Sequence, residues 1–259
     1  MVSGGFDPAA GAPALDIGRV LGGAFAAIRK HWAPFLIYSL ALWCLPNLLL
    51  RFWNISSNAH APDQVLAALG NLARALPIGL VFTPIFQALV AWTIWADGMG
   101  APAGLGVAIP TVGRRLVTIF LAYWLFQLAQ TVGVILLLVP GIMVLLALQV
   151  VVPVCAAEQL SIPEALSRTL FLTRGQRWRL LLLWLAILAV ALGVGMIVGL
   201  TTLMSGAGGL ASPLMVGFRT LVGGAGGLFG AACIGSAYVE FLRLKGGGVG
   251  AEATAEVFA

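Results

Sequence analysis

Charged side chains are scarce in this chain of 259 residues. Only 9% of the residues are Asp, Glu, Lys or Arg, whereas 61% are hydrophobic and the mean hydropathy is +1.04. A soluble domain has about 25% charged residues, so this chain lacks the polar side chains that cover a surface in water. The composition also excludes a disordered chain, and three cysteines are too few for a disulfide framework. We therefore interpret the chain as an integral membrane protein.

Motifs that carry catalysis are missing as well. The sequence contains no Gly-x-Ser-x-Gly nucleophile motif and no phosphate-binding loop. Its two histidines, His31 and His60, are expected on opposite faces of the membrane, so they form no zinc or haem site. The basic residues cluster beside apolar segments, which argues against binding of nucleic acid. We expect a non-enzymatic protein that uses no cofactor, no metal and no nucleic acid.

Six apolar segments are long enough to cross a membrane, which takes about 20 residues. Their approximate ranges are 33–50, 77–96, 116–139, 141–157, 180–203 and 213–241. As one helix, the charge-free run 116–157 would be roughly 63 Å long, about twice the hydrocarbon core, so we expect it to fold back at Pro140 and Gly141. The predicted fold class is an all-α polytopic helical bundle. It forms a single domain over 15–245, between flexible ends at 1–14 and 246–259, without a cleaved signal peptide.

Basic residues are concentrated on one side of the predicted spans. With the N-terminus inside, eleven of the fourteen Lys and Arg residues fall in cytoplasmic segments, and Arg51, Arg74 and Arg219 lie toward the outside. This asymmetry follows the positive-inside rule. We expect a multi-pass protein of a bacterial inner membrane, with both termini in the cytoplasm.

Amphipathic patterns precede the first, third and fifth predicted spans. Apolar residues recur there every three or four positions, with basic residues beside them, as in helices that lie in the lipid headgroup layer. The three stripes are Ile17, Leu21, Phe25, Ile28 and Trp32; Leu105, Ile109, Val112 and Leu116; and Ile162, Leu166, Leu170 and Thr173. Pro110 interrupts the middle stripe. We interpret the chain as three units, each an interfacial helix followed by a two-span hairpin.

The basic residues of these helices are candidates for contacts with anionic lipid headgroups. The candidates are Arg19, Arg29, Lys30, Arg114, Arg115, Arg168, Arg174, Arg177 and Arg179. Basic residues also flank cytoplasmic span ends in proteins that recognise no particular lipid. The pattern is therefore compatible with both interpretations.

A resemblance to a known family rests on the segment 136–180. Its motifs, in order, are Pro140-Gly141, Gln149-Val-Val-Val-Pro153, Glu158, Pro163-Glu-Ala-Leu-Ser-Arg168 and Leu172-Thr-Arg-Gly-Gln-Arg-Trp178, and the opening Leu15-Asp-Ile-Gly-Arg19 fits the same pattern. This order resembles the membrane domain attached to some bacterial glycerophosphodiester phosphodiesterases, and the related YciC-like inner-membrane proteins. In that family the phosphodiesterase activity resides in a separate barrel domain, which this sequence does not contain. The resemblance therefore implies a membrane fold, and we expect no enzyme activity.

Charged residues at the predicted inner boundary form two expected contacts. Glu158 and Arg168 are placed to hold the third interfacial helix against the fourth span. Glu240 precedes Arg243 by three residues, a spacing that permits a local ion pair.

Glutamines within the spans are candidates for an intramembrane polar cluster, made of Gln87, Gln127, Gln130 and Gln149. Gln130 lies ten residues before Pro140 and Gln149 lies nine after it, so an antiparallel hairpin places them at the same depth. We expect these two amides to face each other, where a hydrogen bond contributes about 1 kcal/mol. The cluster either holds the bundle together or lines a path for a solute.

Glycines spaced four residues apart predict close contact between the fifth and sixth spans, because they expose backbone along one helix face. These glycines are Gly195, Gly199, Gly223, Gly226, Gly227 and Gly230.

Two functions from different classes fit these features. The first is a membrane-organising or accessory protein whose basic helices contact anionic lipid, a membrane-protein partner or a second copy of the chain. The alternative is a small-molecule transporter or channel with a polar path among the second, third and fourth spans. A water-filled cavity lined by Gln87, Gln127 and Gln149 would favour transport, whereas a tightly packed bundle would favour the accessory role.

Overall fold

A computed structural model describes residues 15–58, 64–136, 146–158, 160–204 and 213–245. Within these ranges every regular element is helical and there is no strand, so the predicted all-α class is confirmed. Five helical stretches are long and apolar enough to cross a membrane, namely Trp32–Trp53, Leu69–Gly98, Leu116–Gly133, Arg177–Thr201 and Leu214–Lys245. A sixth span and the arrangement in three hairpins stay predictions. The predicted flexible ends, 1–14 and 246–259, lie outside the described residues.

The first span contains a widened turn that the sequence pattern did not predict. Helices α2 (Trp32–Tyr38) and α3 (Leu45–Asn58) are joined by a π-helical turn, η1 (Ser39–Cys44). Pro46 has no backbone N–H for the carbonyl four residues earlier, and the N–H of Leu45 instead reaches Leu40, five residues back. The Asn47 side chain donates to the carbonyl of Trp43 over 2.8 Å. The wider turn directs Trp43 toward α12 (Pro213–Lys245), the last helix.

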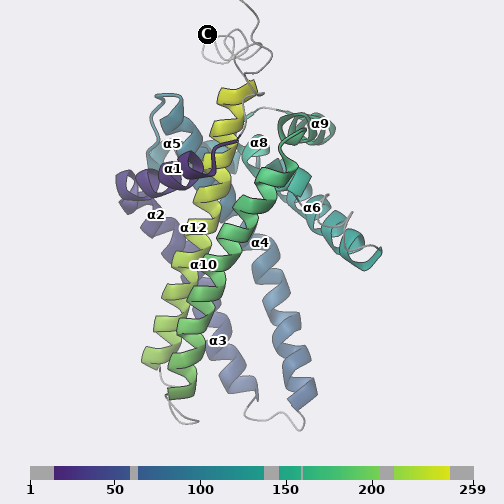
Figure 1. Cartoon of the computed structure of the whole chain (residues 1–259). Helices are drawn as coiled ribbons and strands as arrows, with labels where there is room; N and C mark the ends of the chain where they lie inside the picture. Colours follow the sequence, from purple (N-terminus) through teal and green to yellow (C-terminus); the bar gives the residue numbers. More distant parts are fainter. Residues whose placement is uncertain (1–14, 59–63, 137–145, 159, 205–212, 246–259) are drawn as a thin grey trace, which may run out of the picture.

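Helices α4 (Gln64–Gly98), α10 (Arg177–Met204) and α12 form the long axis of the molecule (Figure 1). Helix α4 starts well before Pro77, the predicted beginning of the second span, and both Pro77 and Pro84 lie inside it. A proline removes one hydrogen bond of a helix without ending it when neighbouring groups or local adjustments compensate. In α12, Pro213 is the first helical residue, as predicted, because a first-turn N–H needs no partner within the helix.

The fourth predicted span differs from a straight helix over 141–157. Pro140 and Gly141, the predicted turn, lie outside the described residues. Residues 146–148 are helical, a turn follows at Gln149 and Val150, and α8 (Val151–Ala157) continues the segment. Pro153 explains the interruption, because its ring clashes with the carbonyl of Gln149 and offers that carbonyl no N–H.

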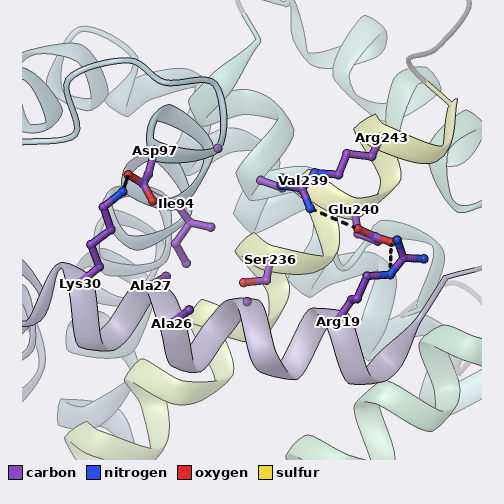
Figure 2. A pocket seen from close by; sticks show the side chains of 12 residues that line it. Arg19, Ala26, Ala27, Lys30, Ile94, Asp97, Ser236, Val239, Glu240 and Arg243 are labelled. Carbon is purple, nitrogen blue, oxygen red and sulfur yellow. Dashed lines mark hydrogen bonds and ion pairs between the residues drawn. The ribbon is translucent and has the colours of Figure 1, made fainter.

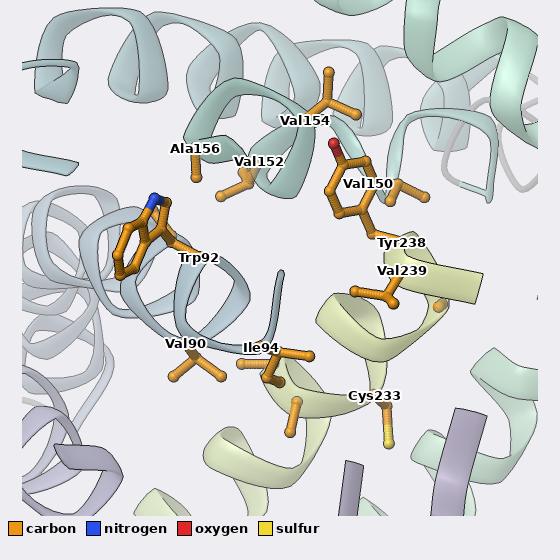
Figure 3. Close-up of a cluster of buried hydrophobic side chains, with 14 of the residues drawn as sticks. Val90, Trp92, Ile94, Val150, Val152, Val154, Ala156, Cys233, Tyr238 and Val239 are labelled. Atoms are coloured by element: carbon orange, nitrogen blue, oxygen red, sulfur yellow. The ribbon is translucent and has the colours of Figure 1, made fainter. Parts of the chain in front are cut away.

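The core lies where α8 meets α4, α6 (Leu116–Leu136) and α12 (Figure 3). All residues of α8 except the last are buried. Trp92 of α4 and Tyr238 of α12 are buried in the same cluster. A helix that is apolar on every side is typical of such a buried position. Helix α8 therefore serves as a packing centre, while α6 and α10 expose most of their apolar surface.

Three amphipathic helices gather at one end of the bundle, which we call the α1 end (Figure 1). They are α1 (Ile17–Lys30), α5 (Leu105–Gly113) and α9 (Ile162–Thr173), so a helix forms at each of the three predicted positions, including the one that contains Pro110.

The face that these helices turn toward the bundle was not part of the prediction. Their buried residues are mostly small, namely Val20, Ala24 and Ala27; Ala108 and Val112; and Ala165, Thr169, Leu172 and Thr173. Several large side chains of the predicted stripes, including Ile17, Leu21 and Ile28, are partly buried against the core. Trp32 is 65% exposed, and Phe25 is 61% exposed although its ring contacts Phe229 of α12. Small residues allow the helix backbones to approach closely, and the exposed members of the stripes lie on the outer surface.

The glycines of α12 contact two different helices. An added Cβ at Gly224 would lie 2.9 Å from Cys44 Sγ and one at Gly227 would lie 3.5 Å from the Trp43 ring, so these two glycines face the first span. Gly226 and Gly230 face α10, as predicted, through Val194 and Ile187.

The expected contribution of Gly195 and Gly199 is wrong. Nothing among the described residues lies within 4 Å of a Cβ added at either position. Helix α10 therefore meets α12 through branched side chains such as Val194 and Ile187, and its glycines face away. The spacing of glycines predicted the pair of helices that meet but not the face of α10.

Candidate functional site

Three carboxylates mark the α1 end of the bundle, and each ends a buried or apolar helix. Asp97 lies at the end of α4, Glu158 directly follows α8, and Glu240 lies near the end of α12. Each pairs with a basic residue of α1 or α9. The pairs are Lys30 with Asp97 (2.5 Å), Arg168 with Glu158 (3.1 Å) and Arg19 with Glu240 (3.3 Å). These ion pairs hold α1 and α9 against the bundle, and only the pair of Glu158 and Arg168 was predicted from the sequence.

Glu158 has the largest set of partners. In addition to Arg168, the buried hydroxyl of Tyr238 donates to its Oε1 over 2.8 Å. Its backbone carbonyl accepts from Arg115, at the start of α6, over 3.3 Å. Glu158, which directly follows α8, therefore connects that helix to α6, α9 and α12.

A polar cavity of about 220 Å³ separates α1 from the ends of α4 and α12 (Figure 2). Its charged lining consists of Arg19, Lys30, Asp97, Glu240 and Arg243. Glu240 is buried, and its carboxylate lies between Arg19 at 3.3 Å and Arg243 at 3.7 Å. The predicted pair of Glu240 and Arg243 is confirmed, but Arg19 is the second partner.

Two buried oxygens at this cavity lack a well-formed hydrogen bond. Ser236 Oγ has no partner among the described residues, and Glu240 Oε1 has only the 3.3 Å ion pair with Arg19. Buried polar atoms are usually satisfied by protein or by ordered water. A cavity of this size, with polar atoms on several sides, meets the requirements of a water site. The arrangement therefore provides a mixed-charge pocket with room for water at the α1 end.

The predicted lipid contacts divide into two groups. Five have protein partners: Arg19, Lys30, Arg115 and Arg168 as described above, and Arg179, which donates to the Leu15 carbonyl over 2.7 Å. The other four are exposed and have no side-chain hydrogen bond or ion pair with any described residue, and they are Arg29, Arg114, Arg174 and Arg177. Three of the nine basic residues that suggested lipid binding therefore form ion pairs within the protein, and two more donate to backbone carbonyls. Lipid contact of all nine residues stays a prediction.

The four arginines without a side-chain partner among the described residues all lie at helix ends. Arg29 lies in the last turn of α1, Arg114 caps the end of α5, Arg174 caps the end of α9, and Arg177 begins α10. Exposed apolar side chains lie near each of them, including Trp32, Ile109, Leu170 and Trp178. Each amphipathic helix therefore ends in a free guanidinium group beside exposed hydrophobic surface.

Carboxylates also cap the beginnings of α1 and α9. Asp16 accepts hydrogen bonds from the backbone N–H groups of Gly18 and Arg19 at 2.9 and 3.2 Å. Glu164 accepts from the hydroxyl and the backbone N–H of Ser161 at 2.7 and 2.8 Å. These bonds lower the pKa of Asp16, mainly through the N–H of Arg19, and lower that of Glu164, mainly through the Ser161 hydroxyl. A carboxylate with a lowered folded pKa stabilises the fold at neutral pH, and the stabilisation is lost as the pH falls through that pKa.

Asp16→Ala is expected to loosen the start of α1. The change removes the acceptor for two N–H groups that lack helical partners. Hydrogen exchange of a peptide covering 15–24 should become about fivefold faster at neutral pH, whereas Asp16→Asn, which keeps a capping oxygen, should stay near wild type. In the wild type, the same loosening should appear as the pH falls below 3.8, the ordinary pKa of the group. Unchanged exchange in Asp16→Ala would show that the ion pairs alone hold α1.

The glutamine cluster stays a prediction. Gln130 and Gln149 are both partly buried, but no hydrogen bond joins them in the described part of the chain. Gln149 lies in the turn before α8, so the register expected for a straight helix does not apply. Neither the polar cavity nor an apolar groove between α3 and α12 is lined by Gln87, Gln127 or Gln149.

Sequence reasoning missed the partners of Asp97 and Glu240 on α1. The signal available was the position of each carboxylate, at the end of a helix that is otherwise almost free of acidic residues. No protein-family model, no curated protein and no solved structure matches this chain.

Proposed function

We propose that this chain is a non-enzymatic protein of a bacterial inner membrane, with a membrane-organising or accessory role, whose three amphipathic helices bind anionic lipid headgroups. The observation that carries the proposal is the set of four exposed arginines without protein partners, one or more at the end of each amphipathic helix. The resemblance to the membrane domain of glycerophosphodiester phosphodiesterases is part of this proposal, and it implies no enzyme activity.

The chemistry of these arginines fits phosphate. A guanidinium group presents a planar fork of donors that binds phosphate oxygens in pairs. Near an anionic membrane surface each basic residue contributes about 1 kcal/mol of attraction. The exposed side chains of Trp32, Ile109 and Trp178 supply the apolar contact that places such a helix at the headgroup boundary. The electrostatic attraction and the apolar contact act together because the arginines and the exposed apolar side chains lie close together in the sequence.

The proposed orientation places the α1 end in the cytoplasm. Most of the basic residues lie at that end, in agreement with the positive-inside rule. The transport alternative required a cavity lined by the glutamines, and the two cavities described have other linings. The lipid-binding role is therefore the function that the observed contacts support best.

Replacing Arg29, Arg114, Arg174 and Arg177 together by glutamine tests the proposal. Native mass spectrometry of the purified full chain should show at least about a tenfold loss of retained phosphatidylglycerol, because four attractive charges are removed. Retention of zwitterionic phosphatidylethanolamine should change little. The matched control replaces the same four residues by lysine, which preserves the charge and should keep most of the binding. Equal retention of phosphatidylglycerol by the wild type and the glutamine variant would reject the proposal.

A further inference from the structure

An unpaired arginine lies at the end of the bundle opposite the α1 end. Arg219 is in the second turn of α12, and its Nε and Nη2 atoms are buried without any hydrogen-bond partner. Arg51 of α3 is close enough for the two like charges to interact. Neither side chain has an ion pair with a described residue. The fold therefore brings two positive charges close together, and none of the described carboxylates lies between them.

Such an arrangement points to a partner outside the chain. A buried charge without a counter-charge is strongly unfavourable, and charged groups within membrane helices usually have a specific partner. The carboxylates that the structure describes, namely Asp16, Asp97, Glu158, Glu164 and Glu240, all lie at the α1 end. In a second copy of the same orientation these carboxylates would also lie at the α1 end, whereas the phosphate of an anionic lipid would supply a negative charge at the opposite end.

An apolar groove of about 550 Å³ lies next to the two arginines, between α12 and the stretch from α2 to α3. Its walls include Ile37, Leu40, Leu45 and Leu221, which are all more than 40% exposed. Leu48, which also lines it, precedes Arg51 by one helical turn, and Thr220 directly follows Arg219. Cys44 and Thr220 close the base, where Cys44 Sγ lies 3.7 Å from the Thr220 carbonyl. Residues that line the groove therefore lie within one helical turn of each arginine.

We propose that one anionic phospholipid binds here, with its phosphate between Arg219 and Arg51 and an acyl chain in the groove. The guanidinium group of Arg219 supplies paired donors to the phosphate. The apolar groove walls contact the acyl chain in place of neighbouring lipid chains. This site lies at the opposite end of the bundle from the four free arginines. It stands independently of the function proposed for the α1 end.

Photolabelling tests the site directly. The purified full chain, in nanodiscs, is exposed to phosphatidylglycerol that carries a photoreactive acyl chain, and labelled peptides are mapped. Labelling of residues 37–48 and 217–221 should be prominent in the wild type and about tenfold lower in Arg219→Gln, because a charge-assisted phosphate contact is lost. A phosphatidylethanolamine probe should label the groove several-fold less.

Two further variants separate binding from folding and from the first proposal. Gly217 lines the groove and has open space around it, so Gly217→Leu fills the groove without a clash and should lower labelling while both arginines remain. Arg29→Gln removes an exposed arginine at the α1 end and should leave groove labelling unchanged. Equal labelling of the wild type and Arg219→Gln, or of the two lipids, would overturn the proposal. Weak labelling of the wild type together with protein–protein crosslinks at the groove would assign it to a second copy instead.

Discussion

Gly235→Leu is expected to lower the melting temperature of the protein by about 6–12 °C, which corresponds to a loss of about 3 kcal/mol in a chain of this size. A Cβ at this position of α12 would lie 3.1 Å from the backbone Cα of Ala91 and 3.2 Å from the Ile94 side chain. Backbone cannot move aside as a side chain can, so α12 and α4 must separate. Because both helices also contact α8, the strain reaches the centre of the core.

A matched control is available in α10. Gly193 is also helical, and an added Cβ there meets nothing within 4 Å among the described residues. Gly193→Leu should be neutral or slightly stabilising, since a helical glycine is less favourable than other residues by about 0.5–1 kcal/mol. Thermal unfolding of the full chain in detergent, followed by tryptophan fluorescence, measures both. Equal melting temperatures for the two variants would contradict the tight packing of α4 on α12.

Glu158→Ala should destabilise the protein by about 2–4 kcal/mol, because it removes the acceptor of the Tyr238 hydroxyl and the counter-charge of Arg168. The side chains of Glu158 and Arg168 are 22% and 31% exposed, so the effect should fall below that of a fully buried ion pair. Glu158→Gln keeps an acceptor for Tyr238 and should be intermediate. The measurement is again the melting temperature, with hydrogen exchange of α9 to show whether that helix is released.

A double-mutant cycle isolates the contact with Tyr238. Tyr238→Phe alone should cost about 1 kcal/mol, and it should cost close to nothing in the Glu158→Ala background. A second control, Glu164→Gln, alters an exposed carboxylate of the same α9 segment and should leave α12 unaffected. Full additivity of Glu158→Ala and Tyr238→Phe would show that the 2.8 Å contact contributes nothing.

Apolar runs and turn residues were reliable guides to the helices. The five helical stretches of membrane-spanning length lie at predicted spans. A run of about 20 apolar residues forms a helix in lipid because a helix satisfies all of its backbone hydrogen bonds within the segment. Prolines were less reliable. Pro77 lies inside α4 although it was the predicted start of a span, and Pro46 and Pro153 coincide with a widened turn and an interruption that periodicity did not show. The effect of a proline depends on which neighbouring groups compensate for the lost hydrogen bond.

The candidate site could be predicted only in its local parts. Contacts between residues close in the sequence were found, such as Glu240 with Arg243 and Glu158 with Arg168. Arg19 reaches Glu240 and Lys30 reaches Asp97 only because α1 lies across the ends of α12 and α4. Composition gives no information on how α1 crosses the other two helices. The sequence therefore predicted nine basic residues for lipid contact, and four of these have no side-chain partner among the described residues.

The sequence by itself predicted an all-helical protein with helices that are long and apolar enough to cross a membrane. It could do so because hydrophobicity and helix length are properties of single segments. It also indicated the basic side of the molecule, since charge asymmetry requires no tertiary contact. Tertiary structure alone decided which small-residue face each amphipathic helix buries, that Gly224 faces Cys44 while Gly226 faces α10, and which arginines remain without a partner. These outcomes depend on distances between residues far apart in the chain, and pairing of a charge is a property of two segments and not of one.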